Sequence, residues 1–576
     1  MLLVYHVRLM YEPCSRNSEP LGRAEIKVPW DTSEYLHGQH KKSYARKIRS
    51  SRLGSFNCVV DSYLNEEGKR LFPKEFESLV PTGKSFSYDV IWDVTRMHFI
   101  EYKQRLEIQK EMPFSISTGS ISNLYKEGLA YFRGCHEAAS PQLREYYQKE
   151  LFVIQVDGTN EGGRYTHFQV RDSRTNNVLI ARKIPTENTA DIEVILHEVE
   201  QRYGRPAAVI ADMSSAIMSA VSNIWDKQVP VFICQFHFLR DIGKDLLGKT
   251  HVNLQKTFST CQITACLNTL RKSFVKNSIK HKKYEQDYLH GIALIDWILD
   301  YKSELKAEGY PFDLQWGKYY QRCLAAYKHI EKIHQHKERR YNQKQTKVLA
   351  QIQGHLSKVT TPITHRRRYH ALKKDAEFFA EVRALFRQET NDNTAPLSRG
   401  AQINSQPQTD HQKMQQQIQA MANSIRQRAE TMRPIRAKRY KKAAKQLEQY
   451  KKRLSNCIVI DQVVHPLPRT NNLCECSFRE IKRQLRRTGG RKNLSQVLDY
   501  TPAEIMLLHN LKDPEYRAIV FQKKEIHEAF AQISQSTIKA ILDKMNSQSE
   551  KKIIDPSIRK VNFLALSKKF YLQTVA

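Results

Sequence analysis

The clearest hydrophobic pattern in the chain is a short run of β-branched and aromatic residues at 151–159, LFVIQVDGT. Such a run predicts a buried strand, and the pair Asp157-Gly158 is predicted to end it. A second apolar run at 207–212, AAVIAD, also ends in an acid, Asp212. We therefore expect two buried strands, each carrying a carboxylate at its end.

Further apolar runs predict an α/β region around these two strands. Residues 165–170 and 178–184, separated by a turn at 172–177, predict an antiparallel meander with the first strand. Asn188 or Thr189 is expected to cap a helix that Gly204 stops. The following pattern predicts a helix at 214–225, a strand at 229–234 and a helix at 236–247. This order of elements is that of the ribonuclease H-like fold, although many other α/β proteins begin similarly.

The pattern before this region changes from strand-like to helical. Residues 1–80 mix short β-like pieces at 2–8 and 24–28 with basic, Ser-rich stretches such as 41–52, which we expect to be loops. From Tyr88 the spacing predicts helices to residue 100, at 106–112 and at 118–132, the last capped by Thr118. This pattern is typical of a helix-turn-helix, in which the last helix enters a DNA groove with its exposed polar residues. Those residues are Ser120, Ser122, Asn123 and Lys126. An ordinary three-helix bundle has the same spacing.

Downstream of residue 247 the strand pattern disappears for about two hundred residues. Residues 248–455 predict helices rich in Lys, His and Gln, interrupted by a Gln-rich stretch at 401–419 that we expect to be a linker. A strand at 457–464 then leads into a helix at 470–487, TNNLCECSFREIKRQLRR, followed by an amphipathic helix at 494–511. On the first of these helices, Glu475, Phe478, Arg479 and Lys482 share one face.

The composition adds a strong positive charge to this picture. The chain has 93 Lys and Arg against 60 Asp and Glu, a formal charge of +33 over 576 residues. An excess of this size favours a polyanionic partner, and nucleic acid more than an anionic membrane. No apolar run reaches the roughly 18–20 residues that a membrane-spanning helix needs. We expect a cytoplasmic, nucleoid-associated protein without structural disulfides, because its ten cysteines contain no CxxC pair.

Three acids in this arrangement suit metal-dependent phosphodiester chemistry. Two Mg²⁺ ions about 4 Å apart can activate an attacking oxygen and stabilise a leaving oxygen. Magnesium prefers a few carboxylate ligands, with water and phosphate completing its shell. Asp157, Asp212 and Glu475 are the candidate ligands for Mg²⁺ (or Mn²⁺). Asp157 and Asp212 could also be ordinary acids that stabilise turns at strand ends.

Several motifs together resemble a DDE transposase with a ribonuclease H-like catalytic domain, of the Mutator-like or ISL3-like bacterial insertion-sequence type. They are VDGT with Asp157, VIADMSSAI with Asp212, CQFH with Cys234 and His237, and TNNLCECSFREIKRQLRRTGGR with Glu475. The resemblance covers about 151–247 and 457–511. It implies catalytic acids on the first strand, the fourth strand and a late helix, with a basic residue seven positions after the Glu, here Lys482. It also implies a supporting role for Cys234 and His237, and a helical insertion between Asp212 and Glu475.

The resemblance implies a function as well. It implies metal-dependent cleavage of double-stranded DNA at element ends, attack of the freed 3′ hydroxyl on target DNA, and a homodimer or larger assembly on DNA. Cations near the acids are expected to contact phosphate, and the alternative is a solvated helix face. They are Arg479, Lys482, Arg483, Arg486 and Arg487. Two rival functions are a catalytically inactive transposase-derived DNA-binding protein and a ribonuclease H-like nuclease without strand transfer.

Two alternatives concern single residues. Glu480 lies on the same predicted helix as Glu475, rotated by about 140° at 3.6 residues per turn, and Lys482 aligns with Glu475. Cys234 and His237 together with Cys474 and Cys476 could supply a zinc set, which a CxC pair supports poorly.

The predicted architecture is therefore an α/β chain in six parts. These are an N-terminal region of unknown function (1–82), a helix-turn-helix region (83–145), the first part of a ribonuclease H-like core (146–247), a basic α-helical insertion (248–455), the last part of the core with the catalytic Glu helix (456–515), and a C-terminal region (516–576).

Overall fold

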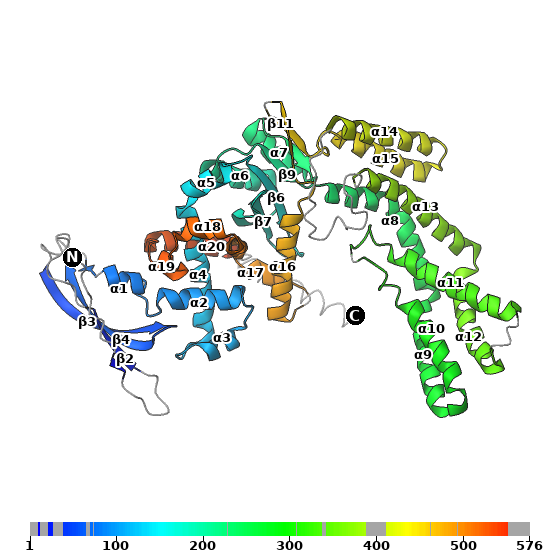
Figure 1. Cartoon of the computed structure of the whole chain (residues 1–576), viewed down its shortest axis with the longest axis horizontal. Coiled ribbons are helices and arrows are strands. Elements are labelled where there is room, and N and C mark those ends of the chain that lie inside the picture. The colour runs from blue at the N-terminus through cyan, green and yellow to red at the C-terminus, as the bar shows by residue number, and fades with distance from the viewer. Residues whose placement is uncertain are drawn as a thin grey trace, which may run out of the picture. The chain divides into compact units, whose positions relative to one another are not determined.

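The computed structural model is mixed α/β and mostly helical, 66% of it in helices, with a five-stranded mixed sheet (Figure 1). It describes residues 10–11, 21–26, 39–64, 70–72, 74–226, 228–306, 308–336, 341–386, 411–460, 462–491 and 493–550. Two compact units are present. Unit 1 comprises 1–209, 214–230 and 473–576, and unit 2 comprises 210–213 and 231–472. None of the described helices combines the length and apolar character needed to cross a membrane.

The N-terminal part of unit 1 forms a small sheet of its own. Its strands are β1 (Met10–Tyr11), β2 (Leu21–Ile26), β3 (Gln39–Ser50), β4 (Gly54–Leu64) and β5 (Arg70–Leu71), in the order β1-β2-β4-β3 with β5 on β4. The expectation of a loop at 41–52 was wrong, because β3 pairs antiparallel with β4 over most of that stretch. Ile48, Phe56 and Phe76 form its buried core. The strand is hard to recognise in the sequence because basic residues lie between the buried residues of β3. The β-like piece predicted at 2–8 lies outside the described residues.

Next in unit 1 is a group of helices built around one long central helix. The helices are α1 (Lys74–Leu79), α2 (Tyr88–Phe99), α3 (Arg105–Glu111), α4 (Thr118–Ala138) and α5 (Ser140–Gln148). The predicted start of α4 is confirmed, but its cap is Ser117, whose Oγ accepts from the Ser120 amide, rather than Thr118. The helix also runs six residues past the predicted end, and it is buried continuously from Glu127 to His136.

The central sheet has the predicted meander and the predicted alternation of helices and strands. Its elements are β6 (Val153–Thr159), β7 (Thr166–Asp172), β8 (Val178–Ile184), α6 (Thr189–Tyr203), β9 (Ala208–Ala211), α7 (Ser215–Trp225) and β10 (Val231–Ile233). The strand order is β10-β9-β6-β7-β8, with β6, β7 and β8 antiparallel. Asn188 caps α6 and Gly204 ends it, as predicted. The boundary between the two units falls within β9.

The C-terminal helices belong to unit 1. They are α16 (Asn472–Gly489), α17 (Ser495–Tyr500), a 3-10 helix η2 (Ala503–Lys512), α18 (Pro514–Phe521), α19 (Ile526–Phe530) and α20 (Gln535–Glu550). The single helix predicted at 494–511 was wrong, because Thr501 is extended before Pro502 and ends α17. The region after 515 packs on α2 and α4, with the Phe530 ring against those of Trp92 and Tyr131.

Unit 2 is a helical body. The chain reaches its helices from a short strand, β10, and two short strands follow them. Its helices are α8 (Gln235–Cys261), α9 (Ile263–Lys280), a 3-10 turn η1 (Lys282–Tyr284), α10 (Glu285–Leu299), α11 (Gln315–His336), α12 (Gln343–Thr360), α13 (Ile363–Leu385), α14 (His411–Glu430) and α15 (Pro434–Tyr450). Helix α8 continues well past the predicted end at 247. The predicted linker at 401–419 was wrong for 411–419, which begin α14, while 401–410 lie outside the described residues. The strand predicted at 457–464 is a hairpin of β11 (Cys457–Ile460) and β12 (Val463–Pro466).

Candidate active site

Asp157 lies inside the central strand of the sheet. The strand β6 continues to Thr159, so the predicted break at Asp157 was wrong, and Asp157 pairs with Gln169 of β7. Its side chain is buried, with 8% of the residue exposed, and its Oδ1 accepts from the Gly158 amide at 3.0 Å. A Cβ on Gly158 would lie 2.1 Å from Glu187 Oε1 and 2.9 Å from Thr166 Cγ2, so a side chain here would require both neighbours to shift. The strand therefore presents one buried carboxylate next to a closely packed glycine.

The first turn of α16 docks on β7 directly beside this position. Gln169, the residue paired with Asp157, donates from Nε2 to the Cys474 carbonyl at 3.2 Å, and Glu475 is the next residue. Arg171 donates to Ser477 Oγ at 2.6 Å. Two hydrogen bonds thus hold the start of α16 to the strand that pairs with β6, and both Asp157 and Glu475 belong to this part of unit 1.

The residues that perform this docking share one face of β7. His167, Gln169 and Arg171 alternate along the strand and therefore point to the same side of the sheet. All three are buried, and His167 Nε2 bonds the Leu498 carbonyl at 2.8 Å. We call these three side chains the polar face of β7. None of the three is a predicted site residue, although three polar residues at a spacing of two within an apolar strand indicate a buried polar face.

Asp212 occupies the predicted place at the end of a strand. It directly follows β9 in unit 2, is half-buried, and comes shortly before Ser214, the N-cap residue of α7. In the sheet order β9 is the neighbour of β6. Within the described residues no group of three or more His, Cys, Asp or Glu side chains forms a preassembled metal site, neither the three acids nor the Cys and His set considered for zinc.

The CQFH segment holds the chain that leads towards α16. The Cys234 amide donates to the Ala211 carbonyl at 2.8 Å, next to Asp212, and the Cys234 Sγ accepts from the Asn471 amide at 3.1 Å. The Gln235 amide donates to the Arg469 carbonyl at 2.9 Å. Cys234 and His237 are both buried. These contacts fit a supporting role for Cys234.

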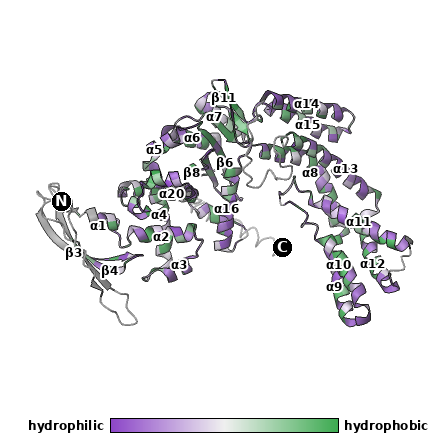
Figure 2. Ribbon diagram, in the orientation of Figure 1, coloured by the Kyte–Doolittle hydropathy of each residue, from purple (hydrophilic) through white to green (hydrophobic). Residues whose placement is uncertain are grey.

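The cations of α16 fall into two groups, those beside an acid and those exposed to solvent. Lys482 Nζ lies 2.8 Å and Arg486 3.5 Å from the Glu161 carboxylate, which follows β6. The hydrogen bond from Lys482 lowers the pKa of Glu161. Arg479, Arg483 and Arg487 are exposed, and Figure 2 shows α16 as largely hydrophilic. Glu480, the rival of Glu475, pairs with Lys512 at 3.1 Å.

The residues predicted to enter a DNA groove occupy the first half of α4. Ser120 takes part in the cap with Ser117, and Ser122 Oγ accepts from Arg105 at 3.0 Å. Asn123 is exposed and Lys126 is half-buried. The role of this half in DNA binding stays a prediction, because the buried second half is equally typical of a bundle.

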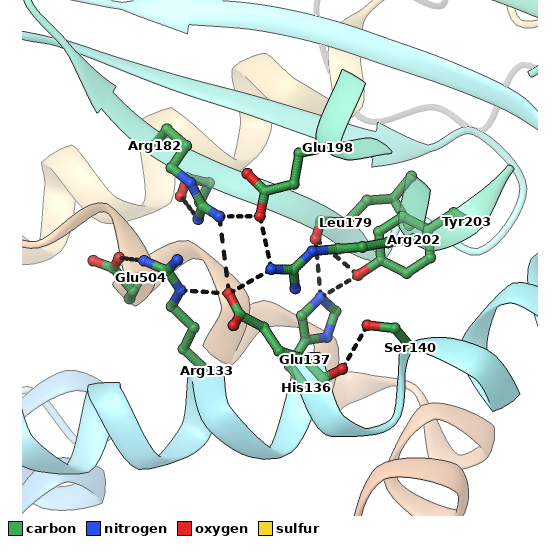
Figure 3. Close-up of polar contacts among 11 residues, drawn as sticks. Arg133, His136, Glu137, Ser140, Leu179, Arg182, Glu198, Arg202, Tyr203 and Glu504 are labelled. Atoms are coloured by element: carbon green, nitrogen blue, oxygen red, sulfur yellow. Dashed lines mark hydrogen bonds and ion pairs between the residues drawn. The ribbon is translucent and has the colours of Figure 1, made fainter. Parts of the chain in front are cut away.

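In a second cluster in unit 1, the charged residues pair with one another (Figure 3). Arg133 of α4 bonds Glu137 and the buried Glu504 of η2, at 2.7 and 2.9 Å, and Arg202 lies 3.0 Å from Glu137. Burial raises the pKa of Glu137, but Arg133 and Arg202 outweigh it and the net pKa is lowered. Burial also lowers the pKa of the adjacent His136 to about 4. Since these charges satisfy one another, the cluster joins α4 to β8, α6 and η2 and does not resemble a reactive site.

Comparison with known proteins adds no relative. No known family model matches the chain, and no curated protein is similar to it.

Proposed function

We propose that the chain is a DDE transposase that cleaves DNA at the ends of a mobile element and transfers the 3′ hydroxyl to target DNA. One observation carries the proposal: Gln169 is paired with Asp157 on β6 and bonds the backbone immediately before Glu475 on α16. It connects two acids that are 318 positions apart in the sequence (475 − 157). A functional connection is the simplest reason for such a precise docking of a mostly hydrophilic helix.

The sheet supports a ribonuclease H-like core for this proposal. In that interpretation the antiparallel meander β8-β7-β6 is extended on its β6 side by β9 and β10, which is the observed strand order. Asp212 then follows the strand next to β6. The run of helices from α8 to α15 between β10 and β11 supports the interpretation of 248–455 as an insertion.

The donor set fits the proposed metal. Asp157, Asp212 and Glu475 offer carboxylate oxygens, the hard ligands that Mg²⁺ prefers. Bound Mg²⁺ would activate the attacking oxygen and stabilise the leaving one. The polar face of β7 would fix the Glu475 helix against β6, and the exposed Arg479, Arg483 and Arg487 would hold the phosphate backbone.

The test is a cleavage and joining assay with matched acid variants. Purified protein is incubated with labelled duplexes that carry the sequences flanking its gene, in Mg²⁺ or in EDTA, and both nicked and joined products are scored. We expect Asp157→Asn and Glu475→Gln to bind DNA nearly as the parent does in EDTA, and to lose cleavage by more than about 100-fold, because even indirect supports of a metal site are worth 10–100-fold. Glu480→Gln is the control, since Glu480 lies on the same helix but pairs with Lys512.

The other functions predict different products. Cleavage without joining would identify a nuclease, and binding without Mg²⁺-dependent cutting would identify an inactive DNA-binding protein. Normal cleavage by Asp157→Asn at saturating Mg²⁺ would overturn the assignment of the acids.

A further inference from the structure

A cleft of about 600 Å³ opens in unit 1 between the helices α2, α3 and α4 and the end of α16. Residues of α2, α3 and α4, among them His98, Leu106 and Tyr125, line one side. Thr488 of α16 and Tyr500 of α17 belong to the other side. The volume lies within the range of pockets that bind small molecules, roughly 300–1,000 Å³. Its size therefore admits one planar ring system.

The cleft offers flat aromatic surfaces. The rings of His98 and Tyr125 are stacked, with centroids 4.4 Å apart and an interplanar angle of 12°, and Phe99 packs edge-on against Tyr125. Tyr500 is 76% exposed, which is unusual for a large aromatic residue. Burial lowers the pKa of His98, so this ring adds an uncharged face at neutral pH. Such faces accept a stacked base of any sequence.

The charge of the cleft identifies the class of ligand. Among the described lining residues none is acidic, and Arg105 is cationic. Arg487 and Arg491, on either side of the lining residues Thr488 and Gly489, are exposed. Neutral aromatic walls with arginines near the opening complement a nucleotide, whose base is flat and whose phosphate is anionic.

We propose that this aromatic cleft binds an unpaired DNA base. Its location relative to cleavage rests on the proposed function: Leu485 and Thr488 are 10 and 13 residues after Glu475, which corresponds to roughly 15–20 Å along a helix rising 1.5 Å per residue. For DNA that runs along α16, at 3.4 Å per base pair, the base would lie roughly four to six positions from the cut. The cleft thus selects DNA whose strands are locally separated beside the cleavage site.

The test measures binding in EDTA, where no cutting occurs. The probes are a blunt 25-base-pair duplex and the same duplex with a five-nucleotide single-stranded tail that carries 2-aminopurine. We expect tighter binding of the tailed probe and a change in 2-aminopurine fluorescence. Tyr500→Ala should weaken binding of the tailed probe by roughly 5- to 150-fold, the equivalent of one stacked base, and leave binding of the blunt duplex within about twofold. Tyr500→Phe should retain the preference.

The control is Val194→Ala on α6, because Val194 is 69% exposed but lies on a helix that contributes nothing to the cleft. Equal binding of both probes by the parent protein, or an unchanged preference in Tyr500→Ala, overturns the inference. So does a Tyr500→Ala variant that dissociates an oligomer without affecting DNA, since the cleft would then hold a second copy of the chain. A protein that shows the fluorescence change but never cuts in Mg²⁺ retains the base site and loses the transposase assignment. Cutting and joining without any fluorescence change would support the transposase assignment and overturn the base site.

Discussion

At the scale of single residues, Arg171 is the least expected feature of the site. Its guanidinium is completely buried, and its hydrogen bonds go to uncharged acceptors on Gln169, Asn176 and Ser477. Burial lowers its pKa to about 10, which still leaves it charged at neutral pH. Burying a charge is costly unless its donors are satisfied. We therefore interpret Arg171 as a positioning residue that fixes the first turn of α16 and, through it, Glu475.

Replacing Arg171 should alter the response to metal as well as the rate. In Arg171→Met, Ser477 on α16 loses the hydrogen bond that Arg171 donates, so Glu475 is less well fixed. We expect cleavage to fall by about 10–100-fold, as for other supports of a metal site. The Mg²⁺ concentration that gives half-maximal cleavage should rise, and excess Mg²⁺ should recover part of the rate. Arg174→Met, at a partly exposed position just after β7, is the control. A lower melting temperature with an unchanged Mg²⁺ midpoint would reduce Arg171 to a structural role.

At the scale of elements, the local signals that predicted the fold were strong caps and continuous apolar runs. The helix from Asn188 to Gly204 has both, and the structure has it as predicted. The strand β3 was missed because its buried residues alternate with cations, and the helix at 494–511 was predicted as continuous although Pro502 divides it. An acid after an apolar run is recognisable locally, which is why Asp157 and Asp212 became candidates; Asp212 does follow its strand, whereas Asp157 lies inside β6. The docking role of Gln169 and Arg171 could not be predicted, because their partners Cys474 and Ser477 are some 305 residues away.

The end of α6 gives a prediction about backbone conformation. Gly204 has φ +88° and ψ 177°, a conformation that is essentially restricted to glycine, and a Cβ there would lie 2.2 Å from Gln148 Nε2. We expect Gly204→Ala to lower the free energy of unfolding by about 1–3 kcal/mol, measured by urea denaturation. Gly119→Ala is the matched control, because its Cβ would meet only Ser117 Oγ, at 3.8 Å. Equal stability of the two variants would show that the chain relaxes freely around residue 204.

At the scale of the whole molecule, the charge of +33 includes a set of lysines on α15, a helix whose single acid, Glu448, pairs with Arg426 of α14. On α15, Lys438, Lys441 and Lys445 are exposed and lie on one face at intervals of three and four residues. Elsewhere in unit 2, lysines at 244, 318 and 373 lie beside acids. Of these two sets, only the first forms a continuous stripe of exposed cations, the arrangement that would suit contact with a phosphate backbone.

The salt dependence of DNA binding should separate these two sets. Each phosphate neutralised contributes about 0.9 to the slope of log affinity against log salt. Replacing Lys438, Lys441 and Lys445 with Gln should therefore reduce the slope by about 2–3, measured by fluorescence anisotropy at several salt concentrations. The same replacement at Lys244, Lys318 and Lys373 removes an equal charge and should change the slope much less. Equal effects would mean that overall charge, rather than the α15 stripe, determines binding.

The free energy of unfolding should decrease as the pH is lowered, because unit 1 buries histidines in their neutral form. Burial lowers the pKa of His136 and of His167 to about 4, against an ordinary value near 6.5. Between these values the unfolded chain binds more protons than the folded one, so their contribution is complete above about pH 6.5 and is lost as the pH falls towards 4. Each should remove on the order of 1 kcal/mol per pH unit in this window. Glu137, whose pKa is lowered, loses its contribution only below the ordinary carboxyl range and does not affect pH 5–7.

Urea denaturation at pH 7 and pH 5 tests this directly, since the free energy of unfolding should be smaller at pH 5. His167→Gln removes one titrating ring while keeping a donor for the Leu498 carbonyl, and it should reduce the difference between the two pH values by about half of the two-histidine effect. His197→Gln, on α6, is the control, because His197 is exposed and should leave the difference unchanged. If His167→Gln and the parent protein lost stability equally between pH 7 and pH 5, the polar face of β7 would have to tolerate a charged imidazole, and the neutral docking of α17 through the Leu498 carbonyl would be wrong.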